Sequence, residues 1–200
     1  TAQSFEEFQT TRANVRLTGT NVGTFGNAFR GYRDGSGTPS MEYPAGSGIE
    51  HLFEGGLWFG GLANGAVRVS TSAYDAPQGY APGRGGFEFN ASQGVQVVEK
   101  SSLRSSPNFR SDAISHQDFL CSFNDSEILV PGTSIPINNH INPMDLEVDM
   151  AVYNWEYSFT DFMVIVDLTI TNNSPNTYEG FYVGLWNNTV VRNINITPAG

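Results

Sequence analysis

The 200-residue chain has a single cysteine and a single lysine, and charged residues make up only 15% of it. One cysteine, Cys121, excludes an intramolecular disulfide and a cysteine-based zinc or redox motif. We therefore interpret Cys121 as a small buried apolar side chain in preference to a reactive thiol. Long apolar runs are also missing, since none approaches the roughly 20 residues that a membrane-spanning helix requires.

Basic residues are scarce as well, with 10 Lys and Arg against 20 Asp and Glu, so the formal net charge is −10 at pH 7. This balance counts against nucleic acids and anionic membranes as partners, because both bind basic surfaces. Hydrophobic residues nevertheless make up 39% of the chain and aromatic residues 12%, which favours a packed core over disorder. Glycine, asparagine, serine and threonine are abundant in place of charged residues. This composition suits an extracellular β-rich protein better than a cytosolic enzyme.

Apolar residues alternate with polar ones along much of the sequence, and this period of two predicts β-strands. The clearest example is residues 162–171, where the even-numbered positions are apolar. An asparagine-rich turn at 172–176 follows, and residues 178–186 alternate again. With a further strand over 189–196, this region predicts an antiparallel meander.

A hairpin is expected between residues 57–62 and 66–72, because Asn64-Gly65 can adopt the positive φ angles of a tight primed turn. Shorter strands are expected at 15–18, 49–53 and 93–100.

The pattern of residues 145–159 predicts one long strand. Its apolar residues stand at even-numbered positions up to Val152 and at odd-numbered positions after it. A β-bulge or a crossing from one sheet to another would produce such a change. Only residues 112–123 have helical features, with Asp112 as a cap and Phe119 and Phe123 four residues apart.

These patterns predict an all-β fold, an antiparallel β-sandwich of the Ig-like or jelly-roll-like kind with at most one short helix. Long Gly/Pro/Ser-rich loops are expected at 31–48, 73–86 and 101–111. We expect residues 1–200 to form a single composite domain, and a subdivision would fall near residues 132–142.

Catalytic constellations are not evident in the sequence. Neither His51 nor His116 lies in a recognised catalytic context, and Ser47 lacks the Gly-x-Ser-x-Gly spacing of a nucleophile elbow. We therefore expect that the protein is not an enzyme.

Three acidic residues, Asp145, Glu147 and Asp149, alternate along one predicted strand face. Carboxylates this close to one another repel unless water or a cation screens them, so they are a candidate calcium site. The alternative, which we favour, is the solvated outer face of an otherwise apolar strand. No other cofactor is expected.

The three tryptophans, Trp58, Trp155 and Trp186, are the candidate ligand-binding residues, because flat aromatic side chains can stack on sugar rings. The same argument applies to Tyr157, Tyr178 and Tyr182. Aromatic residues more often fill the core between sheets, so the alternative hypothesis is that these side chains are buried in the core.

Several segments together resemble stretches of large secreted proteins from bacteria that use the type IX secretion route. They are residues 43–61 (YPAGSGIEHLFEGGLWFGG), 115–119 (SHQDF) with 123–125 (FND), and 155–186, which includes DFMVI and YVGL. The resemblance extends from about residue 14 to residue 193. It implies export to the cell surface or beyond and β-sandwich modules, in a family whose biochemical role is largely undefined and which supplies no catalytic residues. Residues 164–172 also resemble a strand and turn of Ig-like modules of bacterial surface proteins.

The leading functional hypothesis is a non-enzymatic extracellular module of a filament, sheath or adhesin. Such a module would contact copies of itself or other surface proteins through exposed strand edges, with residues 1–12 and 189–196 as candidates for strand donation. The alternative is a carbohydrate-binding or accessory module of a secreted hydrolase. Neither hypothesis involves nucleic acid or a membrane span.

Overall fold

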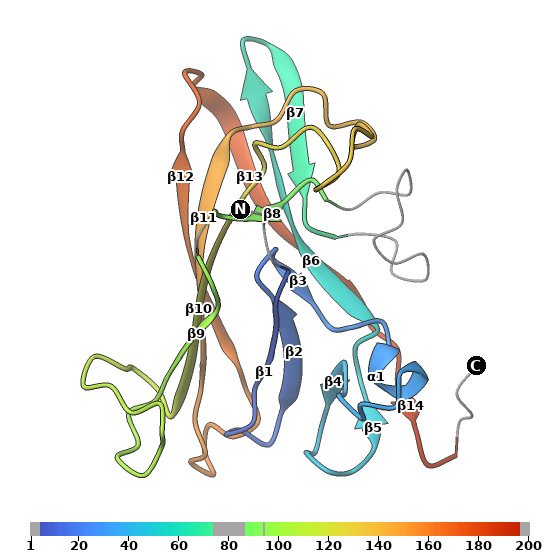
Figure 1. Cartoon of the computed structure of the whole chain (residues 1–200), viewed down its shortest axis with the longest axis vertical. Coiled ribbons are helices and arrows are strands. Elements are labelled where there is room, and N and C mark those ends of the chain that lie inside the picture. The colour runs from blue at the N-terminus through green and yellow to red at the C-terminus, as the bar shows by residue number, and fades with distance from the viewer. Residues whose placement is uncertain (1–4, 74–86, 94, 197–200) are drawn as a thin grey trace.

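The computed structural model describes residues 5–73, 87–93 and 95–196, and over these residues the protein is an all-β structure of antiparallel sheets packed together (Figure 1). The first sheet contains nine of the described strands: β1 (Glu7–Gln9), β2 (Arg16–Thr20), β3 (Thr24–Phe25), β4 (Met41–Glu42), β5 (Ile49–Glu50), β6 (Glu54–Ala63), β7 (Ala66–Thr71), β13 (Tyr178–Asn188) and β14 (Arg192–Asn193). The second contains five: β8 (Asn90–Ala91), β9 (Val98–Lys100), β10 (Gln117–Asn124), β11 (Leu146–Asn154) and β12 (Ile165–Asn172).

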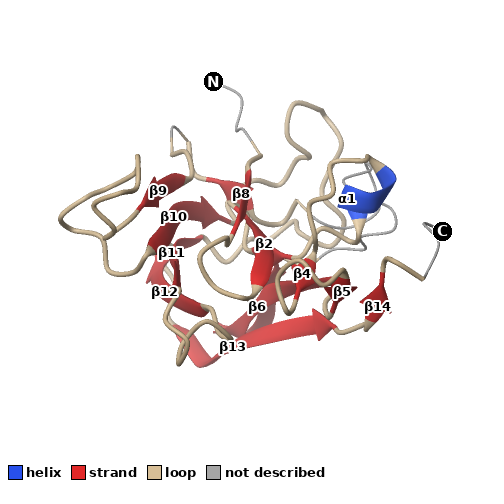
Figure 2. Ribbon diagram, turned by 90° about the horizontal axis from the view of Figure 1, so that it is seen from below, coloured by secondary structure: helices blue, strands red, loops and turns tan. Residues whose placement is uncertain are grey.

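The strand order places β13 and β12 at the margins of their sheets. The first sheet runs β13-β6-β3-β2-β4-β5-β14, and the second runs β12-β11-β10-β8. Seen from below, β9 to β12 form one layer, and β2, β6 and β13 of the first sheet lie beside it (Figure 2).

The core lies between the two sheets and draws on both of them. One hydrophobic cluster unites inward side chains of the first sheet, such as Leu17 and Phe59, with those of the second, such as Phe123 and Val148. Along β11 the residues alternate strictly between buried and less buried positions. This period of two is the reason that the segment forms a strand with one face in the core.

The predicted hairpin is confirmed as β6 and β7, joined at Asn64-Gly65 with φ angles of 51° and 76°. Such angles are the ones a primed turn requires, and they match the twist of the flanking strands. The short strands expected in the first half of the chain correspond to β2 and β5. The strand expected at 93–100 is limited to β9.

The predicted helix over 112–123 is wrong. Residues from Gln117 onward form β10, in which Phe119, Cys121 and Phe123 all face the core. The one helix of the described residues is the short α1 (Arg30–Arg33).

The parity change in residues 145–159 is not a bulge. The pairing of β11 with both neighbours has no register shift, and the strand ends at Asn154, whose fully buried side chain occupies an inward position. Residues 155–164 then leave the sheet through a turn in which the N–H groups of Thr160 and Asp161 donate to the Tyr157 carbonyl.

The predicted meander is also wrong in its pairing. β12 pairs with β11 in the second sheet, whereas β13 pairs with β6 in the first, so the turn at 172–176 carries the chain from one sheet to the other. Of the strand expected at 189–196, only β14 forms, and it pairs with β5.

The remaining predictions concern loops and ends. The segment 31–48 contains β4 and all of α1 but its first residue, as well as turns, and 101–111 is a loop. Most of 73–86 lies outside the described residues. Residues 1–4 are outside them too, but β1 pairs with β2 inside the chain. Among the described residues, no helix has the length and apolar character needed to cross a membrane.

Candidate binding surface

The outer face of β6, β7 and β13 carries a group of exposed apolar side chains, which we call the aromatic face. Residues paired across neighbouring strands point to the same side of a sheet, so the registers show which side chains gather there. Trp58 is paired with Gly184 and Thr71, Gly60 with Tyr182 and Val69, and Gly56 with Trp186. The aromatic face consists of Trp58, Leu62, Val67, Val69, Tyr182 and Trp186.

Two glycines lie in the middle of the aromatic face and keep it open. A Cβ atom added at Gly184 would approach no closer than 3.8 Å to another side chain, that of Trp58, and one added at Gly60 would meet its nearest atom at 3.6 Å. Space above these glycines is therefore available. Trp58 is 49% exposed and Tyr182 is 77% exposed, so a ring or a second chain can contact them directly.

The aromatic face brings together two of the three predicted ligand-binding tryptophans. Trp58 and Trp186 are diagonal neighbours on adjacent strands, while Trp155 lies beyond the end of β11 in the other sheet, with its ring centroid 6.4 Å from that of Tyr153. Tyr182, another aromatic residue that could stack on a sugar ring, joins them on this face. The alternation Tyr182-Gly184-Trp186 places Tyr182 beside Trp186, but its convergence with Trp58 follows only from the pairing of β13 with β6.

The inward face of β13 is also incompletely covered. Val183 and Leu185 are paired with the buried Phe59 and Leu57, yet they are 48% and 56% exposed. Next to them an apolar cleft of about 250 Å³ opens between the sheets. It is lined by Val15, Leu17, Phe25, Met41, Leu52, Phe162, Val164, Val166, Leu185 and Asn187.

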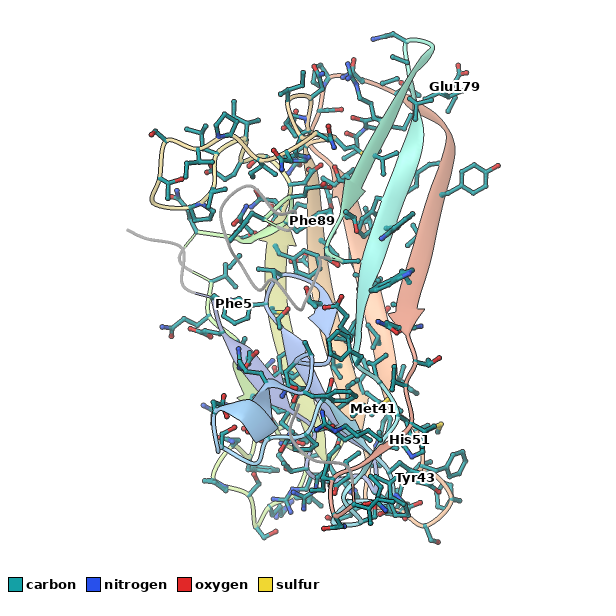
Figure 3. All side chains as sticks on the ribbon, turned by 90° about the vertical axis from the view of Figure 1, so that its right-hand side faces the viewer. Phe5, Met41, Tyr43, His51, Phe89 and Glu179 are labelled. Carbon is teal, nitrogen blue, oxygen red and sulfur yellow. The ribbon has the colours of Figure 1, made fainter. Side chains whose placement is uncertain are left out.

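The cleft therefore lies where the edge strands of the two sheets, β12 and β13, face one another. In Figure 3, β13 stands at the margin of the molecule with Glu179 near its upper end, while Met41, Tyr43 and His51 lie towards the lower end. The second sheet does not extend over the inward side chains of β13, and their apolar atoms remain in contact with water.

The three acidic residues are not brought together. Glu147 and Asp149 point outward from β11 and accept hydrogen bonds from Ser92 and Ser122 of adjacent segments, while Asp145 precedes the strand with a φ of 54°. In the part of the chain that the structure describes, no group of three or more His, Cys, Asp or Glu side chains is arranged to hold a metal ion. These contacts correspond to the hydrogen-bonded outer face of a strand.

Each histidine ring makes a hydrogen bond with the backbone. His51 Nε2 lies 2.9 Å from the Tyr43 carbonyl oxygen, and His140 Nε2 lies 2.7 Å from the Asp125 carbonyl oxygen. The N–H of Glu156 donates to His116 Nδ1. Each of these nitrogens is thus engaged by the main chain rather than by a nucleophilic side chain.

Cys121 is buried and unpaired, as expected from the sequence. Burial raises the pKa of its thiol to about 12, and the nearby carboxylates of Asp149 and Glu6 act in the same direction. The thiol therefore stays protonated at neutral pH, and its role is that of a core side chain.

A buried polar cluster joins the sheets beside β7. The carboxylate of Asp125 accepts the N–H groups of Met144 and Leu146 at 2.8 and 2.7 Å, and it also accepts the Ser70 hydroxyl. Ser70 and Asp125 are both buried, and the three donors all find an acceptor in this carboxylate. The cluster therefore satisfies the hydrogen bonds of buried polar groups.

In comparisons with known proteins, no family model, no curated protein and no solved structure matches the chain. The fold, an antiparallel all-β sandwich, defines the class of the protein.

Proposed function

We propose that the protein is a non-enzymatic extracellular surface module that associates with copies of itself or with neighbouring proteins, as in a filament, sheath or adhesin. The observation that carries the proposal is the joint exposure of the aromatic face and of the inward side chains of β13. Monomeric soluble proteins rarely expose contiguous apolar patches of more than roughly a few hundred Å², and patches larger than that mark interaction sites.

The composition supports the same proposal. The chain has a net charge of −10, but from Gly180 to Val191 it contains no charged residue. Interface cores are depleted in charge and enriched in Trp and Tyr, which are the side chains found on this face. The resemblance of residues 43–61 to secreted proteins of the type IX route supports the cell surface as the location.

Association should depend on concentration. We expect sedimentation velocity from micromolar to near-millimolar concentrations to show dimers or larger species, and negative-stain electron microscopy of concentrated protein to show ordered assemblies. The expected driving force is burial of apolar side chains, so moderate salt should not dissociate the assemblies. A protein that sediments as a monomer at every concentration contradicts self-assembly.

A carbohydrate-binding module is the second candidate, and one observation favours it. Trp58, Tyr182 and Trp186 are exposed on one face around Gly60 and Gly184, an arrangement that leaves room for sugar rings to stack on flat aromatic side chains.

Glycan binding can be tested with a matched set of tryptophan variants. If this face binds sugars, affinity measured on a glycan panel should fall at least about tenfold in Trp58→Ala and Trp186→Ala, as expected when an aromatic contact is lost. Trp155→Ala is the control and should bind normally, because Trp155 lies elsewhere. Absence of binding by the wild-type protein across the panel rejects this candidate.

A further inference from the structure

We propose that β13 is the edge at which two copies of this chain pair, antiparallel and about a twofold axis at Val183, so that the first sheet continues from one copy into the other. This inference rests on the proposed function and deepens it by naming the partner as a second copy and the contact as one strand.

From Gly180 onward β13 has neither the charge nor the proline that commonly protects an edge strand, and its bulge, between Glu179 and Tyr182, lies near its beginning. It is an 11-residue strand, and among the described residues it pairs with β6 only. Natural edge strands carry charges or proline that prevent a further strand from adding. β12 has the exposed Asp167 in its middle, whereas β13 has no charged residue and no proline from Gly180 to its end at Asn188.

Charge favours a second copy at this place. Two chains of net charge −10 repel one another, so a contact between them is least costly where neither surface is charged. β13 is such an uncharged surface, because its one charged residue, Glu179, lies near its beginning. Antiparallel pairing about Val183 places the two Glu179 side chains at opposite ends of the contact.

The side chains of β13 also complement themselves in this register. With Val183 opposite the partner's Val183, Tyr182 faces the partner's Gly184 on the outer side. A Cβ at Gly184 would meet only Trp58, at 3.8 Å, so the space beside this glycine can receive an aromatic ring. Covering a glycine with an aromatic side chain of the neighbouring strand is a known means of stabilising a sheet.

On the inward side, the same register places Phe181 opposite the partner's Leu185. Leu185 lines the apolar cleft between the sheets and is 56% exposed. A second copy of β13 adds its own apolar side chains next to this opening. The pairing therefore covers the part of the core that the second sheet leaves in water, while it satisfies the backbone groups of the edge.

Opposite charges at residue 183 provide the test. A twofold axis at this position makes residue 183 its own neighbour, so Val183→Lys or Val183→Glu places like charges directly across the contact. We expect each variant alone to raise the dimer dissociation constant at least about tenfold in sedimentation velocity. A one-to-one mixture of the two variants should restore association, because Lys then faces Glu.

Val69→Lys is the matched control. Val69 belongs to the aromatic face on β7 and is 50% exposed, close to the 48% of Val183, but it lies away from the β13 edge. We expect it to dimerise like the wild-type protein, and circular dichroism should show that every variant is folded.

Three results would overturn the proposal. If both Val183 variants associate like the wild type, whatever the effect of Val69→Lys, β13 is not the contact. The proposed self-association would still stand in that case. Loss of association that the mixture does not restore removes the twofold axis at Val183. A wild-type protein that is monomeric throughout removes both this pairing and the proposed self-assembly.

Discussion

Glu50 illustrates how a single buried side chain makes the stability of this protein depend on pH. It lies on β5, it is fully buried, and its Oε1 accepts the N–H of Ser40. Its Oε2 is buried and has no hydrogen-bond partner among the described residues. Burial raises the pKa of this carboxyl above its ordinary value of 4.5, against the opposing effects of the Ser40 N–H and the charge of Arg192.

The direction of the pKa shift gives the direction of the pH dependence. Because the folded state holds the proton of Glu50 more tightly than the unfolded chain, the contribution of Glu50 to stability is fully present below about pH 4.5. It is lost as pH rises through the folded-state pKa. Glu50→Gln stays neutral and keeps an acceptor for the Ser40 N–H. Its free energy of unfolding should therefore rise relative to that of the wild type as the pH increases from 4.5 to 7.

Urea denaturation of both proteins at a series of pH values measures this difference. Glu179→Gln, at an exposed position, serves as the control and should follow the wild-type curve. Parallel curves for Glu50→Gln and the wild type would show that Glu50 ionises in the folded protein as it does in the unfolded chain.

At the scale of elements, the sequence predicted strands well where the alternation of apolar residues was unambiguous. The hairpin of β6 and β7 was predicted because Asn64-Gly65 supplies its turn chemistry locally. The failed helix has a simple cause. Residues four apart share a face in a strand as well as in a helix, so Phe119 and Phe123 fit both structures. Cys121, buried between them, is the residue that distinguishes the strand.

Pairing between distant strands was beyond the reach of local patterns. A short turn such as 172–176 can connect neighbouring strands or carry the chain to another sheet, and nothing in its own residues distinguishes these outcomes. The aromatic face depends on the pairing of β13 with β6. Trp58 and Trp186 could therefore be proposed singly as ligand-binding residues, but their convergence with Tyr182 could not.

At the scale of the whole molecule, polar side chains join the two sheets at both ends of β10. At one end, the amide oxygen of Asn154 accepts the N–H groups of Arg12 and Ala13, which connect β1 to β2. At the other end, Asp125 accepts the hydroxyl of Ser70 on β7 and the N–H groups that precede and begin β11. The apolar core between these clusters also draws on both sheets. We therefore expect the sandwich to unfold as one unit.

Asp125→Asn tests this expectation. The amide has one acceptor oxygen where the carboxylate has two, so buried donors such as the Met144 N–H lose their partner. We expect the free energy of unfolding to fall by about 2 to 3 kcal/mol, the cost of leaving a buried donor unsatisfied. Asp149→Asn, on the exposed outer face of β11, is the control and should change it by less than about 0.5 kcal/mol. Tryptophan fluorescence, to which Trp58 and Trp186 of the first sheet contribute, and far-UV circular dichroism, which reports both sheets, should give coincident urea transitions in every case. Transitions that separate in the Asp125 variant would show that the two sheets unfold independently once this link is weakened.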